Sequence, residues 1–414
     1  MKKLFCICFV LLSYAICIAD SIEKLSIAHC YALARENYPA SKRFDLIKQS
    51  ESYNLENATS GYYPQISLNA NAAFLSDTPE MLAAGGLSHD QYHAGITINQ
   101  VIWDGGNISA HKRVTSAQAR AELENNEVLL YQLNDRINKL YFGILLQNEL
   151  LLQNEIQQKD IQTVIDKIQS MISGGIANDY DLNQARVELL NAQQNKTSIL
   201  SAKKSYMNMI SLLLGVEINE HTEFEIPESI EVLKDTIRRP ELDFFIAKEA
   251  LFESKKETVE ASLMPKISLF AMGSYGRASL SGLDKFDFFG IGGISFTWSF
   301  SNFYTQVNER MSLDVEKRLT NLERETFLLN TRIQMVQQDI EIKKMAELLN
   351  QDKNIVNLRT EIAEAAFARM SNGVLSVQDF MRELNAKDLA KQQLIFHKIQ
   401  KLSYEYNFKY ISNN

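Results

Sequence analysis

The hexapeptide YPQISL at residues 63–68 returns 201 residues later as MPKISL at residues 264–269. Each copy is preceded by another proline, Pro39 in the first and Pro240 in the second, 25 residues before the proline of the hexapeptide. A pattern that recurs at one long spacing indicates a duplicated unit rather than a chance match. The sequence therefore predicts a chain built from two similar halves.

Landmarks further along the chain support the duplication. GITI at residues 95–98 corresponds to GISF at residues 293–296, an offset of 198 residues. Gly175, with Asp181 six residues later, corresponds at the same offset to Gly373 with Asp379. We therefore expect two repeats, residues 20–226 and 227–414, with a loop between the hexapeptide and GITI absorbing the three-residue difference.

The composition favours long helices. The 414 residues include only 6 prolines and 17 glycines, which argues against an all-β sandwich or a doubly wound α/β enzyme, since both need many turns. With 45% hydrophobic and 23% charged residues the chain is not disordered, and its net charge of −8 indicates no nucleic-acid partner.

The N-terminus has the three-part pattern of a secretory signal peptide, residues 1–19. Lys2 and Lys3 precede an apolar run at residues 4–18, and small residues precede a cleavage point after Ala19. Cys30 is the only cysteine after this segment, so we expect no internal disulfide, and no good lipid-attachment site is present. No later apolar run is long enough for a spanning helix, so any membrane contact is expected through strands or as a peripheral protein.

Each repeat contains two segments of alternating apolar and polar residues, which predict strands at about 64–75, 93–103, 265–276 and 288–300. Phe270 and Met272 interrupt the polar face of the third. Alternation alone fits a half-buried soluble sheet equally well, but aromatic residues gather near the strand ends, as in membrane β-proteins. The predicted membrane-interface aromatics are Tyr62, Tyr63, Trp103, Trp298 and Phe300, with Phe303 and Tyr304 nearby and Tyr92, Phe286 and Phe288 at the opposite end.

Long helices are expected at about 104–172 and 304–371, each roughly 100 Å long. Both end at glycine turns and reverse into return helices, at about 179–214 and 376–411. The helix before Pro64 and the return helix of that repeat, placed end to end, have the length of one long helix. This predicts a cylinder of helices in which such a pair lies beside the continuous long helices. Four strands per chain cannot close a barrel around a pore, whereas twelve strands from three chains could.

These features resemble the TolC family of outer-membrane efflux and secretion channels, over about residues 24–411. The resemblance rests on LSIA at 25–28, ARENYP at 34–39, PQISL at 64–68 and WDGG at 103–106, taken with the order and duplication of the elements. It implies a trimeric fold, mainly α with membrane β: a twelve-stranded β-barrel in the outer membrane, four strands per chain, continued by an α-helical coiled-coil tunnel across the periplasm. It also implies a passive channel and no enzyme, with no cofactor or metal.

The resemblance implies two kinds of site. Asp181 and Asp379 would line the pore entrance as carboxylate rings, with Arg382 where some relatives have a second aspartate; helix capping is the alternative role of both aspartates. The turns Gly174-Gly175-Ile176 and Asn372-Gly373-Val374 would contact a periplasmic adaptor, or they are simple surface turns. The implied partners are a homotrimer, the adaptor, an inner-membrane transporter of the RND or ABC type, and outer-membrane lipid.

Two other functions compete with a channel. A periplasmic adaptor also has a signal peptide and helical hairpins, but it would not need a duplicated unit of this length. An exported coiled-coil scaffold would not need paired alternating strands at matched places. An enzyme is the weakest reading, because no nucleophile, phosphate or zinc motif is present.

Overall fold

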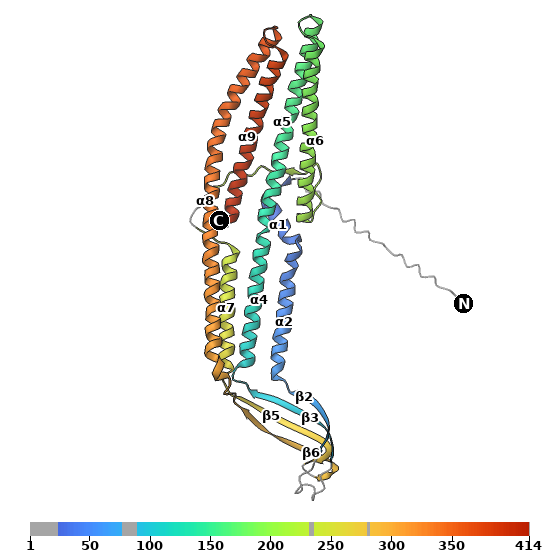
Figure 1. Cartoon of the computed structure of the whole chain (residues 1–414), viewed down its shortest axis with the longest axis vertical. Helices are drawn as coiled ribbons and strands as arrows, with labels where there is room; N and C mark the ends of the chain where they lie inside the picture. The colour runs from blue at the N-terminus through green and yellow to red at the C-terminus, as the bar shows by residue number, and fades with distance from the viewer. Residues whose placement is uncertain (1–23, 77–88, 232–235, 280–281, 414) are drawn as a thin grey trace, which may run out of the picture.

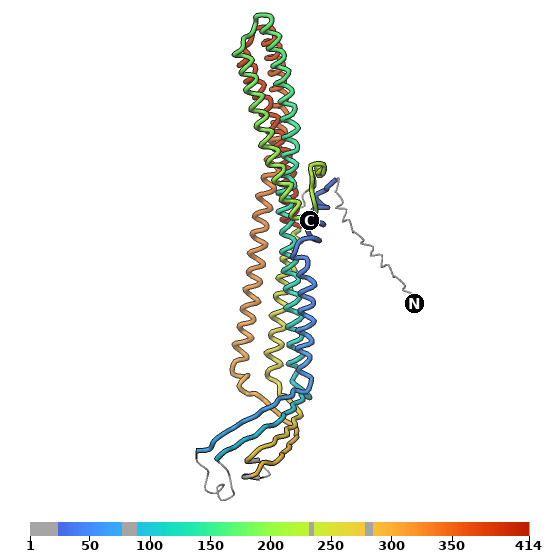
Figure 2. Tube along the Cα trace, turned by 90° about the vertical axis from the view of Figure 1, so that its right-hand side faces the viewer, coloured from blue at the N-terminus to red at the C-terminus, as the bar shows by residue number. Residues whose placement is uncertain are grey.

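The computed structural model describes residues 24–76, 89–231, 236–279 and 282–413. The predicted signal peptide, residues 1–19, lies outside them. The molecule is a long body in which helices run side by side and a β-sheet closes one end (Figure 1). Two helical hairpins form the opposite end, one from each half of the chain (Figures 1 and 2).

Eight α-helices are assigned within the described residues. They are α1 (Ile27–Asn37), α2 (Arg43–Thr59), α4 (Asn107–Tyr131), α5 (Leu133–Ser173), α6 (Asp179–Leu214), α7 (Pro240–Ala261), α8 (Asn302–Ser371) and α9 (Val377–Ser412). The second long helix, α8, is continuous over 70 residues, as its lack of proline and glycine predicts.

Two predicted helices are interrupted in the structure. The helix expected over 104–172 is divided at Gln132 into α4 and α5, although Gln132 keeps helical dihedral angles and its amide still bonds to the Val128 carbonyl at 3.1 Å. The predicted helix is therefore present as two segments that follow one another through Gln132. The helix before Pro64 is divided into α1 and α2 because Pro39 holds Tyr38 in an extended conformation and begins a short 3₁₀ helix, Pro39–Lys42.

Four strands form one antiparallel sheet in the order β2-β3-β5-β6. They are β2 (Gln65–Phe74), β3 (Asp90–Trp103), β5 (Lys266–Ser279) and β6 (Gly282–Thr297). The last strand ends three residues before the predicted limit, so Trp298 and Phe300 follow the strand rather than lie in it. The two hairpins of the repeats are joined through β3 and β5, which leaves β2 and β6 as the edges of the sheet.

A second, two-stranded sheet pairs β1 (Lys24–Leu25) in parallel with β4 (Glu223–Phe224) and so ties the start of the first repeat to its end. The largest apolar core lies beside it. Tyr141 is fully buried there, and its hydroxyl lies 2.9 Å and 2.7 Å from the carbonyl oxygens of Leu25 and Glu225. A second core fills the interior of the two hairpins near their tips, around Ile161, Ile168 and Met370. These cores hold the helical body together between the sheet and the hairpin tips.

Candidate functional site

The two hairpin tips are the first candidate site. Gly175 and Gly373 adopt φ angles of 72° and 71°, the left-handed conformation that lets each long helix end and the chain reverse. Ile176 and Val374 follow them with side chains 60% and 67% exposed. The two turns also touch, because a Cβ atom on Gly373 would lie 3.2 Å from Cγ2 of Ile176. The residues predicted for adaptor contact thus form one exposed surface built from both repeats.

Asp181 and Asp379 both lie in the first turn of a return helix. The Asn178 side chain accepts a bond from the Asp181 amide at 3.1 Å, and the Asp181 carboxylate accepts one from the Asn178 amide at 3.2 Å. In the second repeat, the Ser376 hydroxyl accepts from the Asp379 amide at 3.0 Å and donates to the Asp379 carboxylate at 2.7 Å. Both aspartates therefore take part in N-terminal capping. The helix-capping role is therefore present, and both carboxylates remain half-exposed at the surface.

Arg382 lies one turn after Asp379, and its guanidinium is 3.4 Å from the Asp379 carboxylate. The two side chains are 69% and 47% exposed, so the contact is solvated and weak, but it places a positive charge beside the second aspartate. Asp181 has no such cation among the ion pairs of the described residues. The first repeat therefore presents the less compensated carboxylate.

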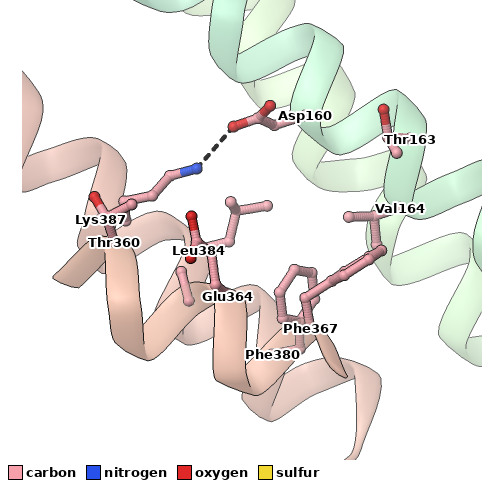
Figure 3. Close-up of a pocket in the computed structure, with 10 residues that line it drawn as sticks. Asp160, Thr163, Val164, Thr360, Glu364, Phe367, Phe380, Leu384 and Lys387 are labelled. Carbon is pink, nitrogen blue, oxygen red and sulfur yellow. Dashed lines mark hydrogen bonds and ion pairs between the residues drawn. The ribbon is translucent and has the colours of Figure 1, made fainter. Parts of the chain in front are cut away.

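A cavity of about 270 Å³ lies between the hairpins, behind the tips (Figure 3). Asp160 of α5 and Lys387 of α9 form an ion pair of 2.7 Å at its edge, and Phe367 and Phe380 lie at its apolar side with ring centroids 5.5 Å apart. Next to Lys387, Asp388 is 1% exposed, and burial raises its pKa to about 6. Sequence reasoning missed this carboxylate, because nothing in the local pattern distinguishes it from a solvated helix residue.

The sheet is the second candidate site. The register places Ile98 opposite Ile66 on one side and opposite Ala271 on the other, and places Leu269 opposite Ile294. A bulge at Ile102 then brings Trp103 opposite Ile267. Because side chains alternate between faces, most of the apolar positions of the four strands fall on one face. That face carries Ile66, Leu68, Ala70, Ala72, Phe74, Tyr92, Ala94, Ile96, Ile98, Ile267, Leu269, Ala271, Tyr275, Phe286, Phe288, Ile294 and Phe296.

The predicted interface aromatics lie at the end of the sheet that joins the helices. Tyr62 and Tyr63 precede β2, Trp103 ends β3, and Trp298 and Phe300 follow β6. All five are exposed, from 42% to 61%. The rings of Trp298 and Phe300 are tilted by 37° with a centroid distance of 4.8 Å, and the indole N–H of Trp298 donates to the Leu263 carbonyl at 2.9 Å. A girdle of this kind, with apolar rings and polar tips, suits the boundary between lipid and water.

Two further properties follow from the described part of the chain. It contains no group of three or more histidine, cysteine, aspartate or glutamate side chains able to hold a metal ion. None of its helices combines the length and the apolar character needed to cross a membrane.

Comparison with known proteins identifies the fold. Residues 32–216 match the family model described as outer membrane efflux protein. The first repeat is therefore similar to the outer membrane efflux proteins. The resemblance to the TolC family is therefore confirmed. No curated protein sequence matches the chain.

Solved structures share the fold over almost the whole chain. The outer membrane protein VceC of Vibrio cholerae is 11% identical with a TM-score of 0.69, and the alignment covers 94% of this chain and 96% of VceC. The CmeC outer membrane channel of Campylobacter jejuni is 14% identical with a TM-score of 0.69, covering 93% and 85%. The open state of the MtrE outer membrane channel of Neisseria gonorrhoeae is 12% identical with a TM-score of 0.67, covering 93% and 88%. The TolC-like fold thus extends beyond residues 32–216 into the second repeat.

Proposed function

We propose that this protein is the outer-membrane channel of a tripartite efflux pump or a type I secretion system. The observation that carries the proposal is the sheet: one face is apolar across all four strands, both edges are open, and long helices extend from one end. The family match over the first repeat and the shared fold support the role of an outer-membrane efflux channel that conducts passively and is not an enzyme. The sheet would lie in the outer membrane and the helices in the periplasm.

A homotrimer would give twelve strands and close the sheet. In lipid, the open edges of β2 and β6 would leave backbone groups unpaired, so these edges must find partners in other copies. The helical body supplies a second argument, because α8 exposes a stripe of apolar side chains at helical spacing. The stripe consists of Val307, Met311, Val315, Leu322, Leu329, Ile333, Val336 and Ile340, each 52% to 60% exposed. Burying so long a stripe against a neighbouring copy would stabilise the assembly.

In such a trimer, Asp181 and Asp379 would each recur three times around the pore entrance. A ring of carboxylates favours cations and disfavours anions. Since Arg382 lies beside Asp379, the Asp181 ring would carry more of the effective charge. We expect Asp181→Asn to weaken block by a multivalent cation more than Asp379→Asn does. Equal block in both variants and the wild type would remove both residues from the pore.

The paired turns would contact the periplasmic adaptor. Gly174, Gly175, Ile176, Asn372, Gly373 and Val374 lie at the free tips of the helices, and Ile176 and Val374 present exposed apolar side chains there. The adaptor would connect the channel to an inner-membrane transporter of the RND or ABC type.

Fractionation followed by reconstitution tests the proposal. We expect a heat-sensitive trimer in outer-membrane fractions that conducts ions across planar bilayers. Recovery as a soluble periplasmic monomer would refute the channel and favour a scaffold. Recovery in the periplasm bound to both an inner-membrane transporter and a separate outer-membrane channel would favour an adaptor.

A further inference from the structure

The polar face of the sheet carries an apolar patch that the proposed function does not explain. The patch consists of Phe270 and Met272 on β5 and Phe289 and Ile291 on β6. Met272 pairs directly with Ile291, Phe270 pairs with Gly293, and Phe289 pairs with Ser274, so the four side chains are neighbours on one face. The other positions of that face are mainly polar or glycine, including Ser67, Asn69, Asn71, Thr97, Asn99 and Ser295.

The patch is not part of the apolar core. Met272 and Ile291 are 36% and 44% exposed, and Phe270 and Phe289 are half-buried. Phe270 has a structural use, because its ring lies over its partner strand, 3.1 Å from where a Cβ atom on Gly293 would be. Met272 and Ile291 lie opposite each other, so neither side chain covers a glycine in the way that Phe270 covers Gly293. No described segment packs over this pair.

The position of the patch depends on the proposed function. If the apolar face of the sheet meets lipid, the polar face lines the water-filled lumen, and the patch lies in the path of the cargo. Towards the centre of the chain's sheet, the patch ends at Thr97 and Asn99 of β3. Across the open edge of β6, the β2 strand of the next copy would present Ser67, Asn69 and Asn71. Each copy would therefore contribute one separate patch to the lumen.

We propose that this patch is a selectivity element of the channel, which contacts the apolar or aromatic part of amphipathic cargo in transit. The inference rests on the proposed function and deepens it by naming a cargo class. Cargo is the occupant we favour because, once the sheets of the copies have closed into a barrel, only molecules passing through the lumen reach this face. Two phenyl rings, a thioether and a branched aliphatic chain offer stacking and dispersion contacts to such groups but no charge.

The test compares two probe cations of equal charge, tetramethylammonium and benzyltrimethylammonium, as blockers of single channels in planar bilayers. Because both carry one charge, the carboxylates at the entrance affect both, and the ratio of their half-blocking concentrations reports the aromatic ring. In the wild type we expect the benzyl probe to block at an about threefold lower concentration, as one aromatic contact provides.

Met272→Thr with Ile291→Thr places a β-branched residue, which suits a strand, at both positions and removes the exposed apolar pair, so the ratio should fall to about one. The matched control, Leu269→Thr with Ile294→Thr, makes the same change in an opposed pair on the other face and should keep the wild-type ratio. Thr97→Val, opposite Met272, enlarges the patch without changing its shape and should raise the ratio.

The outcomes separate the two proposals. The selectivity element is refuted if the wild-type channel does not distinguish the two probes, or if the Met272 and Ile291 variant keeps the wild-type ratio. Either result leaves the proposed channel function intact. An equal fall in the control overturns it as well, because the effect then follows sheet stability. Absence of any channel overturns the proposed function and this inference with it.

Discussion

Asp388 offers a quantitative test of how the two hairpins pack. The residue lies on α9 and is 1% exposed, with one carboxylate oxygen 3.4 Å from the Gln153 amide nitrogen of α5. The other oxygen is buried and has no hydrogen-bond partner. Burial is the largest cause of its raised pKa, Asp160 adds to it, and Lys387 and Lys391 oppose it. The pKa rises from 3.8 to about 6.

A raised carboxyl pKa means that the folded protein binds the proton more tightly than the unfolded chain. Stability is therefore greatest when Asp388 is protonated and falls as the pH rises from 3.8 through 6. Between pH 7.5 and pH 5 the shift corresponds to a gain of about 1.4 kcal/mol per chain from this one group. For a chain of this size such a gain raises the melting temperature by about 2 °C.

The variant Asp388→Asn removes the titration and retains an oxygen for the Gln153 bond. We expect the thermal unfolding midpoint of the wild type to rise by about 2 °C more than that of the variant between pH 7.5 and pH 5. Circular dichroism of the detergent-solubilised protein measures the unfolding midpoints of both proteins at both pH values. Asp181→Asn, the same substitution at a half-exposed position outside the hairpin core, is the control. Identical pH responses of Asp388→Asn and wild type would show that Asp388 is solvated and would refute the packing argument.

Two further substitutions test the ends of the helices. Arg239→Met should destabilise the chain by about 3–5 kcal/mol, because it leaves the buried Glu241 carboxylate without its partner. It also removes the contacts of the guanidinium with the rings of Tyr131 and Tyr410. A denaturant titration would measure this loss, and Arg238→Met, at an exposed neighbouring position, should change the free energy of unfolding little. Gly175→Ala should cost about 1–2 kcal/mol because the turn requires a positive φ, whereas Gly174→Ala at φ −89° should be nearly neutral. Limited proteolysis at the tip would distinguish them, and equal cleavage of both variants would contradict the turn geometry.

Much of the architecture was predictable because it depends on local sequence. The duplicated proline and glycine landmarks mark where helices and strands begin and end, and alternation identifies all four strands. The absence of proline and glycine predicts the continuous α8. The division at Gln132 was not predictable in this way, since neither Gln132 nor its neighbours are helix breakers.

The roles of individual polar residues were only partly predictable. The spacing Asn178 to Asp181 and Ser376 to Asp379 is that of a capping pair, so the sequence allowed both the capping and the entrance reading. The burial of Asp388 and the pairing of Arg239 with Glu241 among aromatic rings depend on helices that are distant in sequence. The local sequence around Asp388 or Arg239 does not show which distant residues will pack against these side chains.

The sequence by itself determined the repeats, the helical body, the strands and the resemblance to outer-membrane channels. Only the tertiary structure decided the faces of the sheet, because Ile98 meets Ala271 across 173 residues of chain, and a register shift of one residue would exchange the two faces. The same register turned Phe270 and Met272 from an irregularity of one strand into a patch shared with β6. Strand pairing between the repeats is a long-range choice, set by the burial and hydrogen bonding of the whole sheet rather than by either strand alone.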